Sequence, residues 1–388
     1  MDKNSVSVAF TGDIGFDKYM DGKWADPELI DGGVLNFFQN SDHVCANVEG
    51  AMIEVAEDSS RSAYFHAMNP RAAGFLSGIG ADLWVVGNNH SMDAGREGIV
   101  STKKIAAESG ARAFGAGIDL ADASAPVYVE GGGGVGIISV CYIAKGTPAT
   151  ETNPGLFHWG NTDSIAKRIK EIKERCRWCV VVAHSGEEFS PMPHPVTREK
   201  YKSYLELGAD AVVAHHPHVP ENYERFDDGK IIFYSLGNFI FDTDYQRAHP
   251  YTDRGVLVRL TFTEESLDFE AMGTRINRDC ERIESAELPE IFENVTEDEY
   301  ELLSPLAAKA FLVDERKKMI YLEPKRFRDA TEDDWNAFFF STEPDGYVKG
   351  EHMDLSLIKP LADRAELSLW KESKLESVKS YLLWQIEF

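Results

Sequence analysis

Three apolar runs follow one another near the middle of the chain: VVVAHSGEEF (residues 180–189), DAVVAHHPHV (210–219) and KIIFYSLGNF (230–239). Each run stops at side chains that can bind a metal or carry a proton, namely His184, His215, His216, His218 and Asn238. A short β-branched run predicts a buried parallel strand, and in open α/β sheets the functional crevice lies at the carboxyl ends of the strands. We therefore predict three ligand-rich loops at one edge of a sheet.

Length and charge limit the classes of protein to consider. The chain has 388 residues, enough for one large domain with an appendage or for two domains, and a hydrophobic content of 43% is typical of a soluble globular protein. It carries 40 Lys and Arg against 65 Asp and Glu, a net charge of -25. Such a surface repels polyanions, so we expect no nucleic-acid partner.

The expected location is the cytoplasm. The first residues, MDKNSVSVAFTGD, lack an apolar core of signal-peptide length, and nowhere do about 18 apolar residues run together, so no membrane association is expected. The five cysteines are an odd number in a large chain, which favours reduced thiols over a disulfide framework. Cys176 and Cys179 have CxxC spacing without a second pair, a weak signal for zinc or redox chemistry.

Earlier apolar runs end at polar residues in the same way. The residues that follow them are Asp13, Glu49, Asn89 and His90, after residues 6–11, 44–48 and 83–86. A lone Asp after a strand is usually a helix cap or a turn former, and Asn89 and His90 could cap the helix predicted behind them. Together, however, these residues repeat the pattern of the central stretch, and one sheet would bring them to a single edge.

Other segments predict the scaffold. Residues 127–140 contain Gly131–Gly134 between two apolar runs and lack the Lys and Ser/Thr of a phosphate-binding loop, so they predict a hairpin. Residues 165–172 and 201–205 show helical spacing of apolar side chains. The segment SPMPHP, residues 190–195, is stiffened by prolines; it either overhangs the crevice and offers His194 there or is a surface loop with an incidental histidine.

The C-terminal part of the sequence has a different pattern of apolar residues. Residues 256–262 and 267–272 predict a last hairpin, and from about Arg282 strand-like runs disappear while helical patterns occupy residues 297–321 and 368–384. We predict a catalytic domain over residues 1–281 and a helical cap or subdomain over residues 282–388. The aromatic residues of that second region are interpreted as packing.

Carboxylate, amide and imidazole side chains at one edge predict a catalytic site for a borderline divalent metal. Manganese or zinc suit this mixture best, with magnesium, calcium or iron as alternatives, and the spacing permits one or two ions. The predicted ligands are Asp13, Glu49, Asn89, His184, His216 and His218. Glu49 would bridge, with Asp13 and His218 on one ion and the other three residues on the second. His90 would carry protons, and Asp93 would orient it or cap the following helix.

These motifs resemble a known family, the bacterial capsule and poly-γ-glutamate biosynthesis proteins of the CapA type, whose fold is similar to that of calcineurin-like metallophosphatases. The resemblance covers roughly residues 5–245 and rests on these motifs: Gly12-Asp13, Asn47-Val48-Glu49, Asn88-Asn89-His90, His184, His215-His216-Pro217-His218 and residues 234–239. It implies a four-layer α/β/β/α sandwich. Three departures are that Gly15 replaces a metallophosphatase histidine, that Ser185 replaces the family's tryptophan, and that the membrane anchor of typical polyglutamate-export members is missing.

Three functions remain open at this point. The resemblance implies a peptide or polyglutamate-like substrate, and our first hypothesis is epimerisation of a peptide Cα, in which the metal stabilises enolate-like charge and His90 acts as a base. The second base would be His194, Glu188 or His43. Metal-dependent phosphoester hydrolysis is the alternative, with His90 protonating the leaving oxygen. A non-catalytic capsule or polyglutamate assembly protein is the third.

Overall fold

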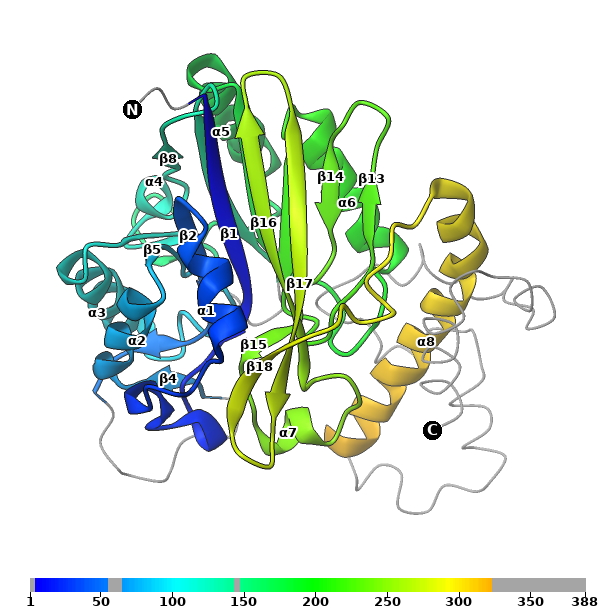
Figure 1. Cartoon of the computed structure of the whole chain (residues 1–388). Helices are drawn as coiled ribbons and strands as arrows, with labels where there is room; N and C mark the ends of the chain where they lie inside the picture. Colours follow the sequence, from blue (N-terminus) through cyan, green and yellow to red (C-terminus); the bar gives the residue numbers. More distant parts are fainter. Residues whose placement is uncertain (1–3, 55–64, 143–146, 323–388) are drawn as a thin grey trace.

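Two β-sheets pack face to face between layers of helices in the computed structural model, which describes residues 4–54, 65–142 and 147–322 (Figure 1). The larger sheet has the strand order β18 (Arg282–Ala286), β17 (Leu267–Asn277), β16 (Arg254–Thr263), β1 (Ser5–Ile14), β2 (His43–Val48), β5 (Ala81–Val85), β6 (Arg112–Phe114), with β15 (Asn238–Ile240) also paired to β1. Strands β1, β2, β5 and β6 are parallel, whereas β16, β17 and β18 add an antiparallel extension.

The smaller sheet has the order β13 (Tyr223–Arg225), β14 (Ile231–Phe233), β12 (Ala211–His215), β11 (Trp178–His184), β9 (Val135–Cys141), β8 (Val127–Val129). Its central strands are parallel, as the apolar runs predicted. Two short pairs lie outside the main sheets: β3 (Ala51–Met52) with β4 (Ala67–Met68), and β7 (Ala116–Gly117) with β10 (Gly155–Leu156).

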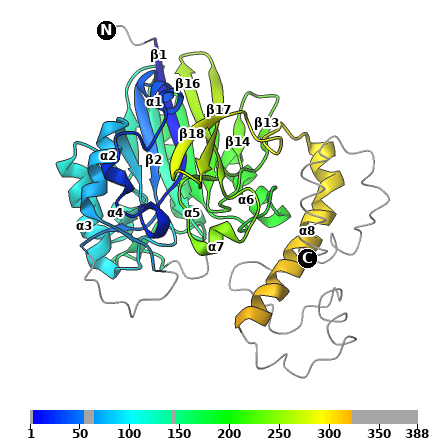
Figure 2. The same ribbon diagram turned by 60° about the horizontal axis from the view of Figure 1, so that its bottom comes forward.

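Helices cover the outer face of each sheet. The α-helices are α1 (Gly32–Gln39), α2 (Ala73–Gly78), α3 (Gly95–Glu108), α4 (Leu120–Ala123), α5 (Thr162–Arg175), α6 (Pro195–Glu206), α7 (Asp244–Arg247) and α8 (Glu297–Leu322). Short 3-10 turns span Lys18–Met20, Lys23–Ala25 and Pro70–Ala72. Helices α1, α2 and α3 cover the larger sheet, and α5 and α6 cover the smaller one (Figures 1 and 2).

Side-chain alternation along the strands explains the layers. In β11, Val180 and Val182 point into the core between the sheets, where they meet Val6 and Val8 of β1. Val181, between them, points the other way into the cluster formed with α5 and α6. Because successive strand residues face opposite sides, a strand that is apolar at every position must be covered on both faces. The four-layer α/β/β/α sandwich expected from the sequence is confirmed.

The predicted scaffold segments are mostly found where expected. Strands β8 and β9 form the hairpin around Gly131–Gly134, and β16 and β17 form the later one. The isoleucines of α5 and the tyrosines of α6 are buried against the smaller sheet. All five cysteines are free, which confirms the expectation of reduced thiols.

The larger sheet continues past residue 281. Strand β18 pairs with β17 through Ile283, which is fully buried, so the prediction that strand-like runs end near Arg282 is wrong by one strand. The reason is that β18 is a short edge strand with one face in solvent, which leaves only a weak apolar signal. The division into residues 1–281 and 282–388 stays a prediction. Helix α8 matches the pattern over residues 297–321, whereas the helix expected over 368–384 lies outside the described residues.

Helix α8 lies on the side of the sandwich (Figure 2), where the buried Arg198 side chain links its first residue to β13. The Arg198 side chain on α6 is 1% exposed and donates to both carboxylate oxygens of Glu224 on β13, at 2.6 and 3.0 Å. It also donates to Glu297 at the start of α8, at 2.6 and 3.1 Å, and its guanidinium lies over the Tyr300 ring. None of the described helices is long and apolar enough to cross a bilayer.

The Arg198→Ala variant is expected to lose about 3–5 kcal/mol of unfolding free energy, because Glu224 would keep a buried charge without a partner. Urea unfolding followed by circular dichroism measures this loss. Glu297→Gln is the matched control, since the Glu297 side chain is 54% exposed and an exposed pair contributes at most about 1 kcal/mol. Equal losses in the two variants would contradict this account.

Candidate metal centre

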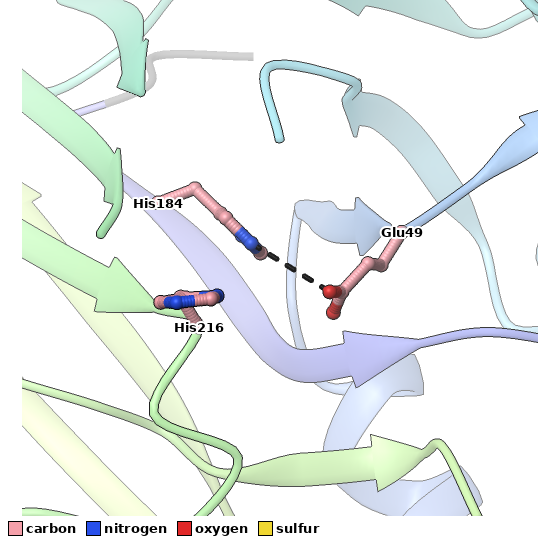
Figure 3. Close-up of side chains that lie close together, drawn as sticks. All are labelled: Glu49, His184 and His216. Carbon is pink, nitrogen blue, oxygen red and sulfur yellow. Dashed lines mark ion pairs between the residues drawn. The ribbon is translucent and has the colours of Figure 1, made fainter. Parts of the chain in front are cut away.

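The predicted ligands meet at the carboxyl ends of strands from both sheets. Asp13 lies near the end of β1 and Glu49 directly follows β2, both in the larger sheet. In the smaller sheet, His184 is the last residue of β11, and His216 directly follows β12. Figure 3 shows Glu49, His184 and His216 pointing toward one another across the gap between the sheets. The structure therefore brings these side chains together, but at the adjoining strand ends of two sheets and not, as predicted, at one edge of a single sheet.

Glu49 is the centre of the cluster. Its Oε1 atom lies 3.7 Å from His184 Nε2, 3.7 Å from His218 Nε2 and 3.9 Å from His90 Nε2. Two groups of potential ligand atoms, each within 4.8 Å, share this carboxylate: Glu49, His184 and His216, and Asp13, Glu49 and His218. Glu49 is thus shared by both groups, and its bridging role stays a prediction.

Asn89 joins the first group. Its Oδ1 atom lies 3.0 Å from His184 Nε2, so the amide oxygen and the imidazole nitrogen face the same space. Its neighbour Asn88 has a different role, because its side chain donates to the backbone oxygen of Val48 at 2.7 Å and holds the loop after β5 against β2.

Two further asparagines orient the ligands, and the sequence did not single out their roles. Asn47 donates to Asp13 Oδ1 at 2.7 Å, and its Nδ2 lies 3.3 Å from His184 Nδ1. Asn238 Oδ1 lies 3.0 Å from His218 Nδ1. Because Nδ1 of His218 faces Asn238, its Nε2 is the nitrogen presented to Glu49.

Unsatisfied polar atoms mark the place where a cation fits. Both carboxylate oxygens of Glu49 and Nδ1 of His216 are buried and have no hydrogen-bond partner within the described part of the chain. Leaving a buried carboxylate without partners is expensive, whereas coordination of a divalent ion satisfies it. Carboxylate, imidazole and amide donors together suit manganese, iron or zinc. The residues present thus fit a divalent ion, and they do not identify it.

The pKa shifts of Glu49, His184 and His216 also favour a cation site. Burial raises the pKa of Glu49 well above its usual value, although the charge of His218 opposes the shift. Burial and the neighbouring His216 lower the pKa of His184 well below its usual value, and burial lowers the pKa of His216 to about 3. Both imidazoles therefore keep the lone pairs that a cation needs. Burial alone would lower the pKa of His218, but Glu49 and Asp13 raise it to about 10, so this ring would have to lose a proton to bind a cation.

His90 lies beside the ligands with its ring fixed. Asp93 Oδ2 lies 2.8 Å from His90 Nδ1, so the orienting role weighed for Asp93 agrees with the geometry. The same carboxylate oxygen accepts from the backbone N–H of His66 at 2.8 Å. The His66 ring is edge-on to His90, with centroids 4.3 Å apart, and its Nδ1 lies 2.5 Å from Asp17 Oδ2. Nothing in the sequence pointed to His66 or Asp17, because neither follows an apolar run.

The other predicted proton carriers occupy different places. Glu188 belongs to a third group of potential ligand atoms, with His216 and His218. His194 is 1% exposed and lies at the start of α6, where its Nδ1 is 3.7 Å from Glu187 Oε2. His43 begins β2 and contacts Asp82, and so lies at the opposite end of that strand from Glu49. His43 is therefore ruled out as the second base, whereas the roles of Glu188 and His194 stay predictions.

The proline-containing loop packs against the C-terminal helix. Met192 is buried with Tyr300, Leu303 and Leu306 of α8, and the Tyr300 hydroxyl donates to the backbone oxygen of Pro193 at 3.0 Å. His215 also has a structural role. Its Nε2 lies 2.8 Å from the backbone oxygen of Thr11, a contact that joins the two sheets below the ligands.

The fold is a four-layer sandwich of the metallophosphatase-like class, and the cluster lies at its strand ends. Within that class, the chain belongs to the bacterial capsule synthesis protein family, PGA_cap, whose family model matches residues 7–243. The family expected from the sequence motifs is therefore confirmed.

Several relatives are similar to this chain. It is 30% identical to the PGA biosynthesis protein CapA of Bacillus subtilis over 63% of this chain and 65% of that protein. It is 30% identical to the capsule biosynthesis protein CapA of Bacillus anthracis, over 55% and 54% of the two chains. A probable polyglutamine synthesis accessory protein of Mycobacterium tuberculosis is 25% identical over 52% and 56%. The chain thus spans less than two thirds of the length of these relatives.

Removal of the metal and its re-addition should change the melting temperature of the protein. Manganese is expected to raise the melting temperature of chelator-treated protein, because an ion that binds only the folded state contributes about 2.7 kcal/mol at 100 times its Kd. Differential scanning fluorimetry measures the shift. Glu49→Gln should abolish the response, and Asp82→Asn, at the other end of the sheet, should retain it. An unchanged response in Glu49→Gln would contradict the central position of this carboxylate.

Proposed function

We propose that this chain is a metal-dependent enzyme that acts on a peptide or polyglutamate-like substrate and inverts the configuration of one Cα atom. The observation that carries the proposal is the His90–Asp93 pair beside a buried cluster of unsatisfied carboxylate oxygens and neutral imidazoles. Removal of an α-proton needs a fixed base next to a centre that stabilises negative charge, and these residues supply both.

Each residue has a defined part in this reaction. Asp13, Glu49, Asn89, His184, His216 and His218 would hold the metal. The bound ion would supply positive charge that stabilises an oxygen of the substrate as the α-proton leaves. His90 takes the proton at Nε2, because Asp93 faces Nδ1 and fixes the ring. Burial lowers the pKa of His90, which Asp93 partly opposes, so the ring is neutral and able to accept a proton at pH 7.

Inversion also requires that a proton return to the opposite face of the carbon. His194 and Glu188 are the side chains expected to carry it. The substrate class is inferred from the names of the relatives, which refer to PGA, capsule and polyglutamine synthesis. A cytoplasmic location belongs to the same proposal.

The direct test uses exchange with heavy water. Purified protein with manganese is incubated in D2O with a panel of peptides that includes α-linked and γ-linked glutamate oligomers. Incorporation of deuterium at one Cα, followed by chiral amino-acid analysis, would support the proposal. A complete panel that stays unlabelled would count against it.

His90→Gln is expected to reduce the exchange rate by about 10²–10⁴-fold, the usual contribution of a general base. Metal content should stay at the wild-type level, since His90 is not among the proposed ligands. Asp93→Asn should give a smaller loss, and Asp82→Asn should exchange at the wild-type rate. If His90→Gln loses both metal and exchange, the residue is a ligand rather than a base.

Phosphoester hydrolysis is the second candidate. It is favoured by one specific observation, that Glu49 belongs to two ligand groups. A carboxylate shared between two ions is typical of sites that clamp the attacking and leaving oxygens of a displacement. Turnover of phosphomonoesters or phosphodiesters with manganese, in a protein that labels no peptide, would favour this candidate. A protein that binds glutamate oligomers equally well with and without His90, and turns over neither class, would be a binding protein.

A further inference from the structure

Several residues with a strained backbone lie on one side of the candidate metal centre. Within the described residues, non-glycine positions with left-handed backbone include Phe189 at φ 63°, His216 at φ 100° and His218 at φ 59°. Each such conformation is unfavourable by itself and persists only where surrounding contacts hold it. These three residues lie in two loops, one after β11 and one after β12, which meet beside the cluster.

The two loops are tied to each other. The backbone N–H of Phe189 donates to the backbone oxygen of Pro217 at 2.7 Å, between the two strained histidines. The Phe189 ring stacks on His249 with centroids 3.8 Å apart and an angle of 9°. These contacts hold the residue before Phe189 in place. That residue is Glu188, whose carboxylate lies within 4.8 Å of ligand atoms of His216 and His218.

A side chain at residue 15 could not reach the cluster beside Asp13. A Cβ atom on Gly15 would lie 2.5 Å from Cδ2 of Phe241, so the aromatic ring fills the space that a side chain at residue 15 would need. Phe241 also stacks on His218, with centroids 4.8 Å apart and an angle of 18°. On this side the described ligands are limited to Asp13, Glu49 and His218.

We propose that Glu188 is a metal ligand that completes the centre from the loop after β11, where a side chain at residue 15 has no room. This inference rests on the cation site of the proposed function and reassigns Glu188 from proton carrier to ligand. The centre would then hold three carboxylates, from Asp13, Glu49 and Glu188, with three imidazoles. Added carboxylate oxygen favours manganese over zinc, because hard oxygen ligands suit manganese.

Metal binding without substrate tests the proposal. Chelator-treated wild-type protein and Glu188→Gln are titrated with manganese by calorimetry, and bound metal is counted by mass spectrometry after dialysis. Glu188→Gln is expected to bind manganese at least about tenfold more weakly, since even loss of an indirect partner of a ligand costs that much. The loss should be smaller for zinc.

Three variants make the outcome decisive. Glu188→Asp keeps a carboxylate and should recover part of the affinity. Glu199→Gln, on the exposed face of α6, should bind manganese as the wild type does. Tyr245→Phe removes only the hydroxyl that lies 3.4 Å from Glu188 Oε2 and should cost much less than Glu188→Gln.

The result separates this inference from the proposed function. Wild-type manganese affinity in Glu188→Gln, with Glu49→Gln impaired, overturns the ligand assignment. If Glu188→Gln keeps the manganese affinity of the wild type but loses Cα exchange, Glu188 carries a proton and the proposed function stands. If Glu188→Gln loses manganese but the wild type labels no peptide, the ligand assignment stands and the proposed reaction fails.

Discussion

The buried carboxylate of Glu49 is the constraint on which the rest of the site depends. Three imidazoles from the ends of three different strands approach one of its oxygens, and no described hydrogen bond satisfies either oxygen. A charge in such a place is stable only when an opposite charge compensates it. The fold therefore has to form a cation site in addition to its four layers. The same strand ends meet both requirements.

The scaffold holds this arrangement by contacts below and beside the ligands. His215 joins the two sheets through Thr11, while Asn47 and Asn238 set the orientation of the histidines that face the cluster. These partners keep the ligand nitrogens directed at one space before any ion binds, which reduces the cost of ordering them. The strained loops beside His216 and His218 have the same effect, because their conformation is stabilised by neighbours rather than by local preference.

Much of the candidate site could be predicted from the sequence, because the predicted ligands come directly after apolar runs. Asp13, Glu49, His184 and His216 each come at or directly after the end of a strand, and the rule that strand ends share one edge groups them within each sheet. The packing of the two sheets then brings the two groups together. His66 and Asp17 could not be found in this way, because they enter through loops whose path depends on tertiary packing. Strand β18 was missed because an edge strand has little apolar pattern to detect.

By itself, the sequence determined the parallel central strands and the polar side chains at their ends, because burial on two faces and termination in polar residues are local properties of each run. The four layers were expected from the family resemblance. The tertiary structure alone decided that Phe241 fills the space beside Gly15 and that Arg198 joins Glu224 to Glu297. These contacts link residues far apart in the chain, and their distances follow from how two sheets and their loops pack, which no local pattern encodes.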